Sequence, residues 1–150
     1  MPKHSCVRQA RCGRCQARDL LAYLSEEGVA WAIATSGRRE SAQPALDLLG
    51  VAPEVVIVTR DQVSHAKPDP HLFLAAAERL HVDIETAIVV GDSVWDLLAA
   101  RRARALGVGL LSGGYGDDEL QRAGAYRVYA DPADLLRHLD EVGVRRRTED

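Results

Sequence analysis

Short apolar runs alternate with helical patterns from Ala17 onward, and this alternation constrains the fold more than any other feature of the sequence. The runs cover residues 29–34, 55–58, 87–90 and 108–111, and their continuous apolar character is typical of strands covered on both faces. Strands that alternate with helices form parallel sheets built from βα units. We therefore predict an α/β fold in which helices cover both faces of a parallel sheet.

Helix signals fill the segments between these runs. Each predicted helix shows at least one of three signals: apolar residues at helical spacing, a glycine that closes it, or an Asp-Pro pair that opens it. The predicted helices are residues 20–28 ending at Gly28, 39–49 ending before Gly50, a helix from Pro70 capped by Asp69, 97–105 closed by Gly107, 118–123, and a terminal helix started by Asp131 and Pro132. Residues 127–129 are predicted as a last edge strand.

The composition fits one globular domain. A chain of 150 residues with 47% hydrophobic and 27% charged residues is long enough to bury an apolar core. We assign residues 1–16 to an irregular leader, 17–142 to the core domain and 143–150 to a polar tail. The tail contains three consecutive arginines, which we interpret as a solvated end.

Charge and hydropathy argue against two classes of partner. The net charge of −3 gives no overall basic field, so we expect no nucleic-acid partner. The longest apolar stretches, residues 29–34 and 105–111, fall short of the roughly 18 residues needed to span a bilayer. We therefore expect no membrane span. Residues 1–16 also lack the apolar segment of a signal peptide, and we expect a cytoplasmic protein.

All three cysteines lie in the leader. Cys6, Cys12 and Cys15 are odd in number, which argues against a disulfide framework. With His4 they offer the thiolate and imidazole ligands that tetrahedral zinc prefers. Only the CxxC half matches the usual spacing, so a zinc site and an unstructured leader both stay open.

Polar side chains directly follow the predicted strands, where parallel sheets bind their ligands. Thr35 and Ser36 follow the first strand, Lys67 lies in the loop before the Pro70 helix, and Asp92 and Asp96 follow the strand at residues 87–90. Hydroxyls and amides bind phosphate oxygens, lysine neutralises their charge, and two carboxylates four residues apart suit magnesium. The set predicts a phosphoryl site.

Three strings in this set resemble known motifs. IATSG at Ile33–Gly37, AKPDP at Ala66–Pro70 and VVGDSVWD at Val89–Asp96 resemble motifs two, three and four of the haloacid dehalogenase superfamily, in the right order. Their form is most similar to the phosphoglycolate phosphatase and β-phosphoglucomutase branch. The resemblance covers about 120 residues and implies a Rossmann-like three-layer core.

The resemblance also implies a role for each residue. Thr35 and Lys67 would be catalytic, and Thr35, Ser36 and Lys67 would bind phosphate. Mg²⁺ would be the cofactor, held by Asp92, with Asp96 as a direct or water-mediated ligand. The substrate would be a small phosphorylated metabolite.

One part of the family pattern has no counterpart. The first motif supplies the nucleophilic aspartate at the end of its own strand and precedes motif two. Here the acidic residues before Thr35 are Asp19, Glu26 and Glu27, all in a predicted helix. The helical cap between motifs one and two has no counterpart either. We therefore expect a core truncated at its N-terminus and inactive as it stands, because covalent phosphoryl transfer needs a nucleophile.

The missing strand would lie centrally, between the strands that end at Thr35 and at Asp92. Either those two strands close up or the sheet stays open, which would favour self-association. Two functions follow: a phosphatase core whose full-length form hydrolyses a small phosphate ester, or a non-catalytic module that binds magnesium and phosphate. A receiver domain has its acids before its lysine, the reverse of the order here, and the glycines do not spell a dinucleotide-binding GxGxxG.

Overall fold

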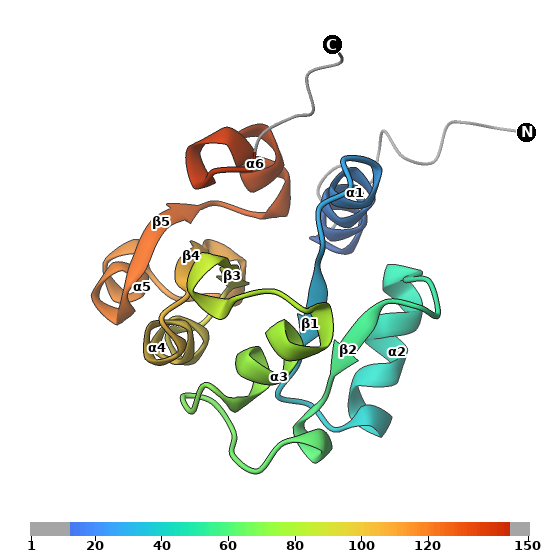
Figure 1. Ribbon diagram of the computed structural model, residues 1–150. Helices are drawn as coiled ribbons and strands as arrows, with labels where there is room; N and C mark the ends of the chain where they lie inside the picture. The colour runs from blue at the N-terminus through green and yellow to red at the C-terminus, as the bar shows by residue number, and fades with distance from the viewer. Residues whose placement is uncertain (1–12, 145–150) are drawn as a thin grey trace, which may run out of the picture.

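Helices and parallel strands alternate along residues 13–144, the part of the chain that this computed structural model describes (Figure 1). The strands are β1 (Ala32–Ala34), β2 (Val56–Val58), β3 (Ile88–Gly91), β4 (Leu106–Leu110) and β5 (Ala125–Tyr129). The helices are α1 (Gly13–Glu26), α2 (Arg39–Leu49), α3 (His71–Leu80), α4 (Val94–Ala103), α5 (Asp117–Ala123) and α6 (Pro132–Arg137). The predicted α/β class is confirmed, since every strand pair is parallel.

The described strands form two sheets rather than one. β1 pairs with β2, and β3, β4 and β5 pair in that order. Within residues 13–144, β1 has no strand partner on its other edge, and neither does β3. Figure 1 shows β1 and β2 standing apart from β3 and β4. Of the two arrangements expected from the sequence, residues 13–144 therefore show the open sheet.

Helices hold the two sheets together. α3 packs against β1, β2 and α4, while α4 packs on β3 and β4 and α5 on β5. On the other face, α1 packs against α2 and α6, and Leu20 of α1 joins the apolar cluster that contains Val108 and Leu135. The strands therefore lie between two helical layers, as a three-layer core requires.

Local capping explains where several helices begin and end, and a number of these ends differ from the predicted ones. Asp131 accepts a hydrogen bond from the Asp134 amide at 2.8 Å and begins α6, as expected. α3 begins one residue later than predicted, at His71. α4 stops at Ala103 because Arg104 takes a left-handed conformation, φ 63°, from which its amide bonds the Ala100 and Arg101 carbonyls. Gly107, predicted to close this helix, lies in β4 instead.

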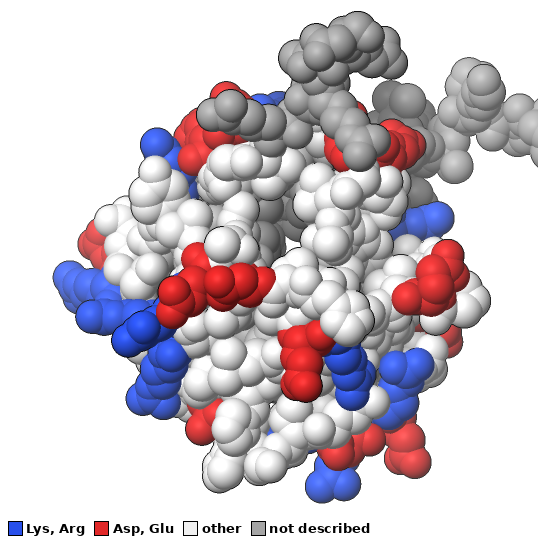
Figure 2. Space-filling view, viewed as in Figure 1, with Lys and Arg blue, Asp and Glu red and all other residues white. Residues whose placement is uncertain are grey.

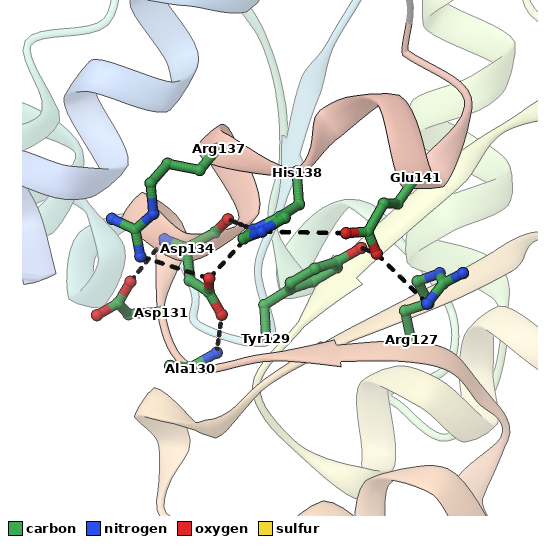
Figure 3. Close-up of polar contacts among 8 residues, drawn as sticks. All are labelled: Arg127, Tyr129, Ala130, Asp131, Asp134, Arg137, His138 and Glu141. Carbon is green, nitrogen blue, oxygen red and sulfur yellow. Dashed lines mark hydrogen bonds and ion pairs between the residues drawn. The ribbon is translucent and has the colours of Figure 1, made fainter.

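A polar network fastens the C-terminal segment to β5 (Figure 3). Tyr129 donates a hydrogen bond to Glu141 Oε2 at 3.3 Å, and the Arg127 guanidinium lies 3.3 Å from the same oxygen. The His138 ring stacks on the Tyr129 ring with centroids 5.8 Å apart. These contacts fix residues 138–141 over the last strand.

The chain ends differ in two details from the predicted boundaries. α1 begins at Gly13, so residues 13–16 are helical rather than part of an irregular leader. Val144 packs against the Leu20 cluster and belongs to the core rather than to the tail. The candidate zinc ligands His4, Cys6 and Cys12 lie outside the described residues. Among residues 13–144 no helix is both long and apolar enough to cross a bilayer.

Candidate phosphate and metal site

The five predicted site residues line one cavity between the two sheets. Thr35 and Ser36 follow β1, Asp92 and Asp96 follow β3, and Lys67 lies in the loop before α3. The cavity has a volume of about 340 Å³. A larger surface cleft of about 520 Å³ lies beside α2 and β2 and contains none of the five. The three predicted segments therefore meet in space, although the roles assigned to their residues stay predictions.

Lys67 is held in this cavity by Asp96. Its Nζ lies 2.6 Å from Asp96 Oδ1, and the two side chains are only 11% and 12% exposed. The same ammonium lies 5.1 Å from the centroid of the Phe73 ring, within range of a favourable cation–π contact. A buried ammonium needs such partners because desolvation of an unpaired charge is costly. Asp96 thereby fixes the position of the positive charge.

The second oxygen of Asp96 organises the backbone after β3. Oδ2 accepts hydrogen bonds from the Asp92 amide at 3.2 Å, the Ser93 amide at 3.3 Å and the Ser93 hydroxyl at 3.0 Å. Ser93 Oγ in turn accepts from the Asp96 amide at 3.2 Å, which completes a capping box for α4. The spacing of GDxxxD suggested that both acids face one point, but it did not predict that Asp96 pairs with Lys67.

Two glycines permit this close packing. A Cβ on Gly91 would lie 2.3 Å from Asp96 Cβ, and a Cβ on Gly113 would lie 2.1 Å from the Asp92 carbonyl oxygen. Either contact is far inside van der Waals distance, so a side chain at these positions would displace the acids. Gly91 precedes Asp92 in the GD string and is therefore marked by the motif, whereas the contact between Gly113 and Asp92 was not predicted.

Thr35 presents a hydroxyl donor at the cavity. Its Oγ1 accepts a hydrogen bond from the Gly37 amide at 3.1 Å, and its own amide is bonded to the Val58 carbonyl at 2.9 Å. Because a hydroxyl both accepts and donates, the Oγ1 proton remains for a ligand oxygen. The neighbouring Ser36 is exposed at the cavity rim.

Asp92 is the carboxylate open to a cation. Its side chain is exposed, and within residues 13–144 no hydrogen bond or ion pair engages its oxygens. Magnesium binds through one or two carboxylates and keeps several waters, so Asp92 fits this ion. Both oxygens of Asp96 are occupied by Lys67, Ser93 and the Asp92 amide, which favours an indirect role for Asp96.

Comparisons with known proteins show the family of this chain. The family model of haloacid dehalogenase-like hydrolases matches residues 14–104. The chain belongs to this family. Among curated relatives, the validoxylamine A 7′-phosphate phosphatase of Streptomyces hygroscopicus subsp. limoneus is 40% identical over 95 residues, which are 63% of this chain and 45% of that protein. Phosphoglycolate phosphatases from Agrobacterium fabrum and Rhodospirillum rubrum are also similar, in line with the predicted branch.

Solved structures share the fold of this haloacid dehalogenase-like chain. A hydrolase from Pseudomonas syringae is 54% identical with a TM-score of 0.82, over 85% of this chain and 59% of that one. A family member from Deinococcus radiodurans, solved with bound phosphate and sodium, is 33% identical with a TM-score of 0.77 over the same shares. The chain thus spans about half the length of the curated relatives it matches.

Proposed function

We propose that this domain binds Mg²⁺ and the phosphate group of a small phosphorylated metabolite at the cavity between β1 and β3. The observation that carries the proposal is the meeting of Thr35, Lys67 and Asp92 at one cavity, two of them from the ends of β1 and β3 and Lys67 from the loop before α3. The phosphate found in the Deinococcus relative supports it. The same cavity is the phosphoryl-binding part of a phosphatase core.

Each residue has a defined task in this proposal. The Lys67 ammonium, held by Asp96, neutralises negative charge on the phosphate, and the Thr35 hydroxyl donates to one phosphate oxygen. Mg²⁺ supplies a second positive charge and is held by Asp92 and by water. Ser36, at the rim, adds a further hydroxyl donor. The Lys67 ammonium and the Mg²⁺ ion thus neutralise the negative charge of the phosphate from two sides of the cavity.

Hydrolysis needs a nucleophile in addition to these groups. Among the described residues that line the cavity, the carboxylates are Asp92 and Asp96, one assigned to the metal and one committed to Lys67. We propose that magnesium-dependent hydrolysis belongs to a form in which a further aspartate reaches the cavity. The 150-residue chain by itself is then a binding module, the second function considered from the sequence.

Phosphate binding can be tested with a matched pair of lysine variants, since Lys3 and Lys67 are the lysines of this chain. Titration of the protein with inorganic phosphate and Mg²⁺, followed by calorimetry, should give a phosphate affinity that falls at least tenfold in Lys67→Ala. Lys3→Ala should bind as the unchanged protein does. If both variants bind equally, Lys67 is not part of the site.

Magnesium binding and turnover separate the two functions. Asp92→Asn should abolish the magnesium dependence of phosphate binding, because it removes the carboxylate that the described cavity residues leave uncommitted. The unchanged chain should release no phosphate from a generic phosphate ester above background. Turnover that disappears in Lys67→Ala would instead assign catalysis to this chain and require a nucleophile among its own residues.

A further inference from the structure

Three metal-ligating side chains converge in the loop that carries Lys67. His65 Nδ1 and His71 Nδ1 lie 3.2 Å apart, and Asp69 Oδ1 lies 3.5 Å from His71 Nδ1. The three ligand atoms all lie within 4.8 Å of one another. None of these residues lines the phosphate cavity, so the cluster is separate from the site described above.

The spacing of these atoms suits a tetrahedral metal ion. Ligands about 2.0–2.1 Å from a tetrahedral centre are separated from each other by about 3.3–3.4 Å. The distances from His71 Nδ1 to His65 Nδ1 and to Asp69 Oδ1, 3.2 and 3.5 Å, bracket that value. We propose that His65, Asp69 and His71 form a binding site for a transition-metal ion such as Zn²⁺, Ni²⁺ or Co²⁺, with the fourth position left to water.

The ligand types separate this site from the magnesium site. Two imidazoles and one carboxylate are the donors that zinc, nickel and cobalt prefer, whereas magnesium takes oxygen ligands. Asp69 is oriented for the task because its Oδ1 also accepts the His71 amide at 3.2 Å. His71 is the first residue of α3, so one ligand stands on a helix and two on the preceding loop.

A metal here would tie the Lys67 loop to α3. His65 is exposed and Asp69 and His71 are half-buried, so an ion can enter from solvent. Lys67 lies between His65 and Asp69 in the sequence, and a bridge from His65 to His71 closes the short loop around it. The bound form is therefore expected to be more resistant to heat than the free form.

The alternative is a plain hydrogen bond in which one Nδ1–H donates to the other Nδ1, and the test must distinguish the two. Cobalt titration is suitable, because thiolate ligation by the cysteines gives a charge-transfer absorption that imidazole ligation lacks. The full chain with Cys6, Cys12 and Cys15 changed to serine removes that competition. One Co²⁺ per chain should bind and raise the melting temperature.

Variants then locate the ion. His71→Ala and His65→Ala should each weaken Co²⁺ binding at least tenfold, and acidification should release the ion because protons compete for the ligand atoms. His81→Asn is the matched control, since His81 is exposed, lies at the other end of α3 in the left-handed region, and asparagine tolerates that conformation. Binding that is absent, or that survives both histidine variants, would leave a histidine hydrogen bond only and overturn the proposal.

Discussion

Gly91 leaves the space that the Asp96 side chain occupies. Gly91→Ala would place a methyl group 2.3 Å from Asp96 Cβ, so Asp96 must move away and release Lys67. We expect the free energy of unfolding to fall by about 1–3 kcal/mol, with weaker phosphate binding. Urea denaturation measures the first effect. Gly13→Ala is the control, because among the described residues no atom outside the chain neighbours and the backbone of α1 lies within 4 Å of the added carbon. Equal stability of the two variants would contradict the clash expected at Gly91.

Ionisation of Tyr129 makes the free energy of unfolding depend on pH in the alkaline range. Burial and the neighbouring Glu141 carboxylate, which also accepts its hydrogen bond, raise the pKa of Tyr129 above its ordinary value near 10. The folded state then holds its proton when the unfolded state has lost it. The stabilising contribution is full below pH 10 and is lost as the pH rises through the folded pKa. Between pH 9 and pH 11 the free energy of unfolding should fall more steeply in the unchanged protein than in Tyr129→Phe. Parallel pH profiles of the two proteins would contradict this role of Tyr129.

At the scale of elements, the Asp131 cap is the contact on which the start of α6 depends. Asp131→Ala removes the acceptor of the Asp134 amide and should lower the free energy of unfolding by about 1 kcal/mol. Thermal and urea unfolding would measure the change. Asp140→Ala is a suitable control, since Asp140 is exposed and its side chain caps no helix. A similar loss of stability in both variants would show that the removal of a negative charge, rather than the removal of the helix cap, is responsible.

Elements with a local signal were predicted well, and those fixed by distant partners were not. α2 has the predicted bounds, Arg39–Leu49, because its apolar spacing and closing glycine are local. β1 is shorter than the predicted run 29–34, since its pairing with β2 extends only from Ala32 opposite Val56. The left-handed Arg104 carries no sequence signal. Strand length and this helix end depend on tertiary contacts.

The candidate site divides in the same way. Its location followed from polar residues at strand ends, because parallel strands bring those ends to one edge. The ion pair between Lys67 and Asp96 was not predicted, since both residues were assigned to ligands and lie in different motifs. The cluster of His65, Asp69 and His71 was also missed, because a loop has no periodicity from which a shared direction can be derived.

At the scale of the whole molecule, the gap between the sheets predicts an alternation in amide exchange. The Thr35 amide is bonded to Val58 of β2, and successive amides of a strand point to opposite sides, so the Ala34 amide faces the gap. In a dilute monomer Ala34 should exchange much faster than Thr35. A peptide strand of apolar residues ending in aspartate should slow Ala34 by pairing with β1. Slow exchange at both amides without peptide would mean that the gap is filled.

Charge is distributed without a dominant sign over the face seen in Figure 2, where basic and acidic side chains are interspersed. Such a surface offers no continuous positive field to a polyanion on that face. The expected absence of a nucleic-acid partner stays a prediction.

Self-association through the gap between the sheets also stays a prediction. Sedimentation of the unchanged chain at several concentrations would measure it.

The connection of the two sheets through α3 and α4 has a mechanical consequence. Ala34 of β1 packs against the apolar cluster formed by Val89 of β3 with Phe73, Ala99 and Ala100. We therefore expect the volumes of these side chains to affect the width of the opening between Thr35 and Asp92. Replacing one of the interior alanines by a larger residue would then change the distance between Thr35 and Asp92. Such a change alters the shape of the site without altering any residue that touches the ligand.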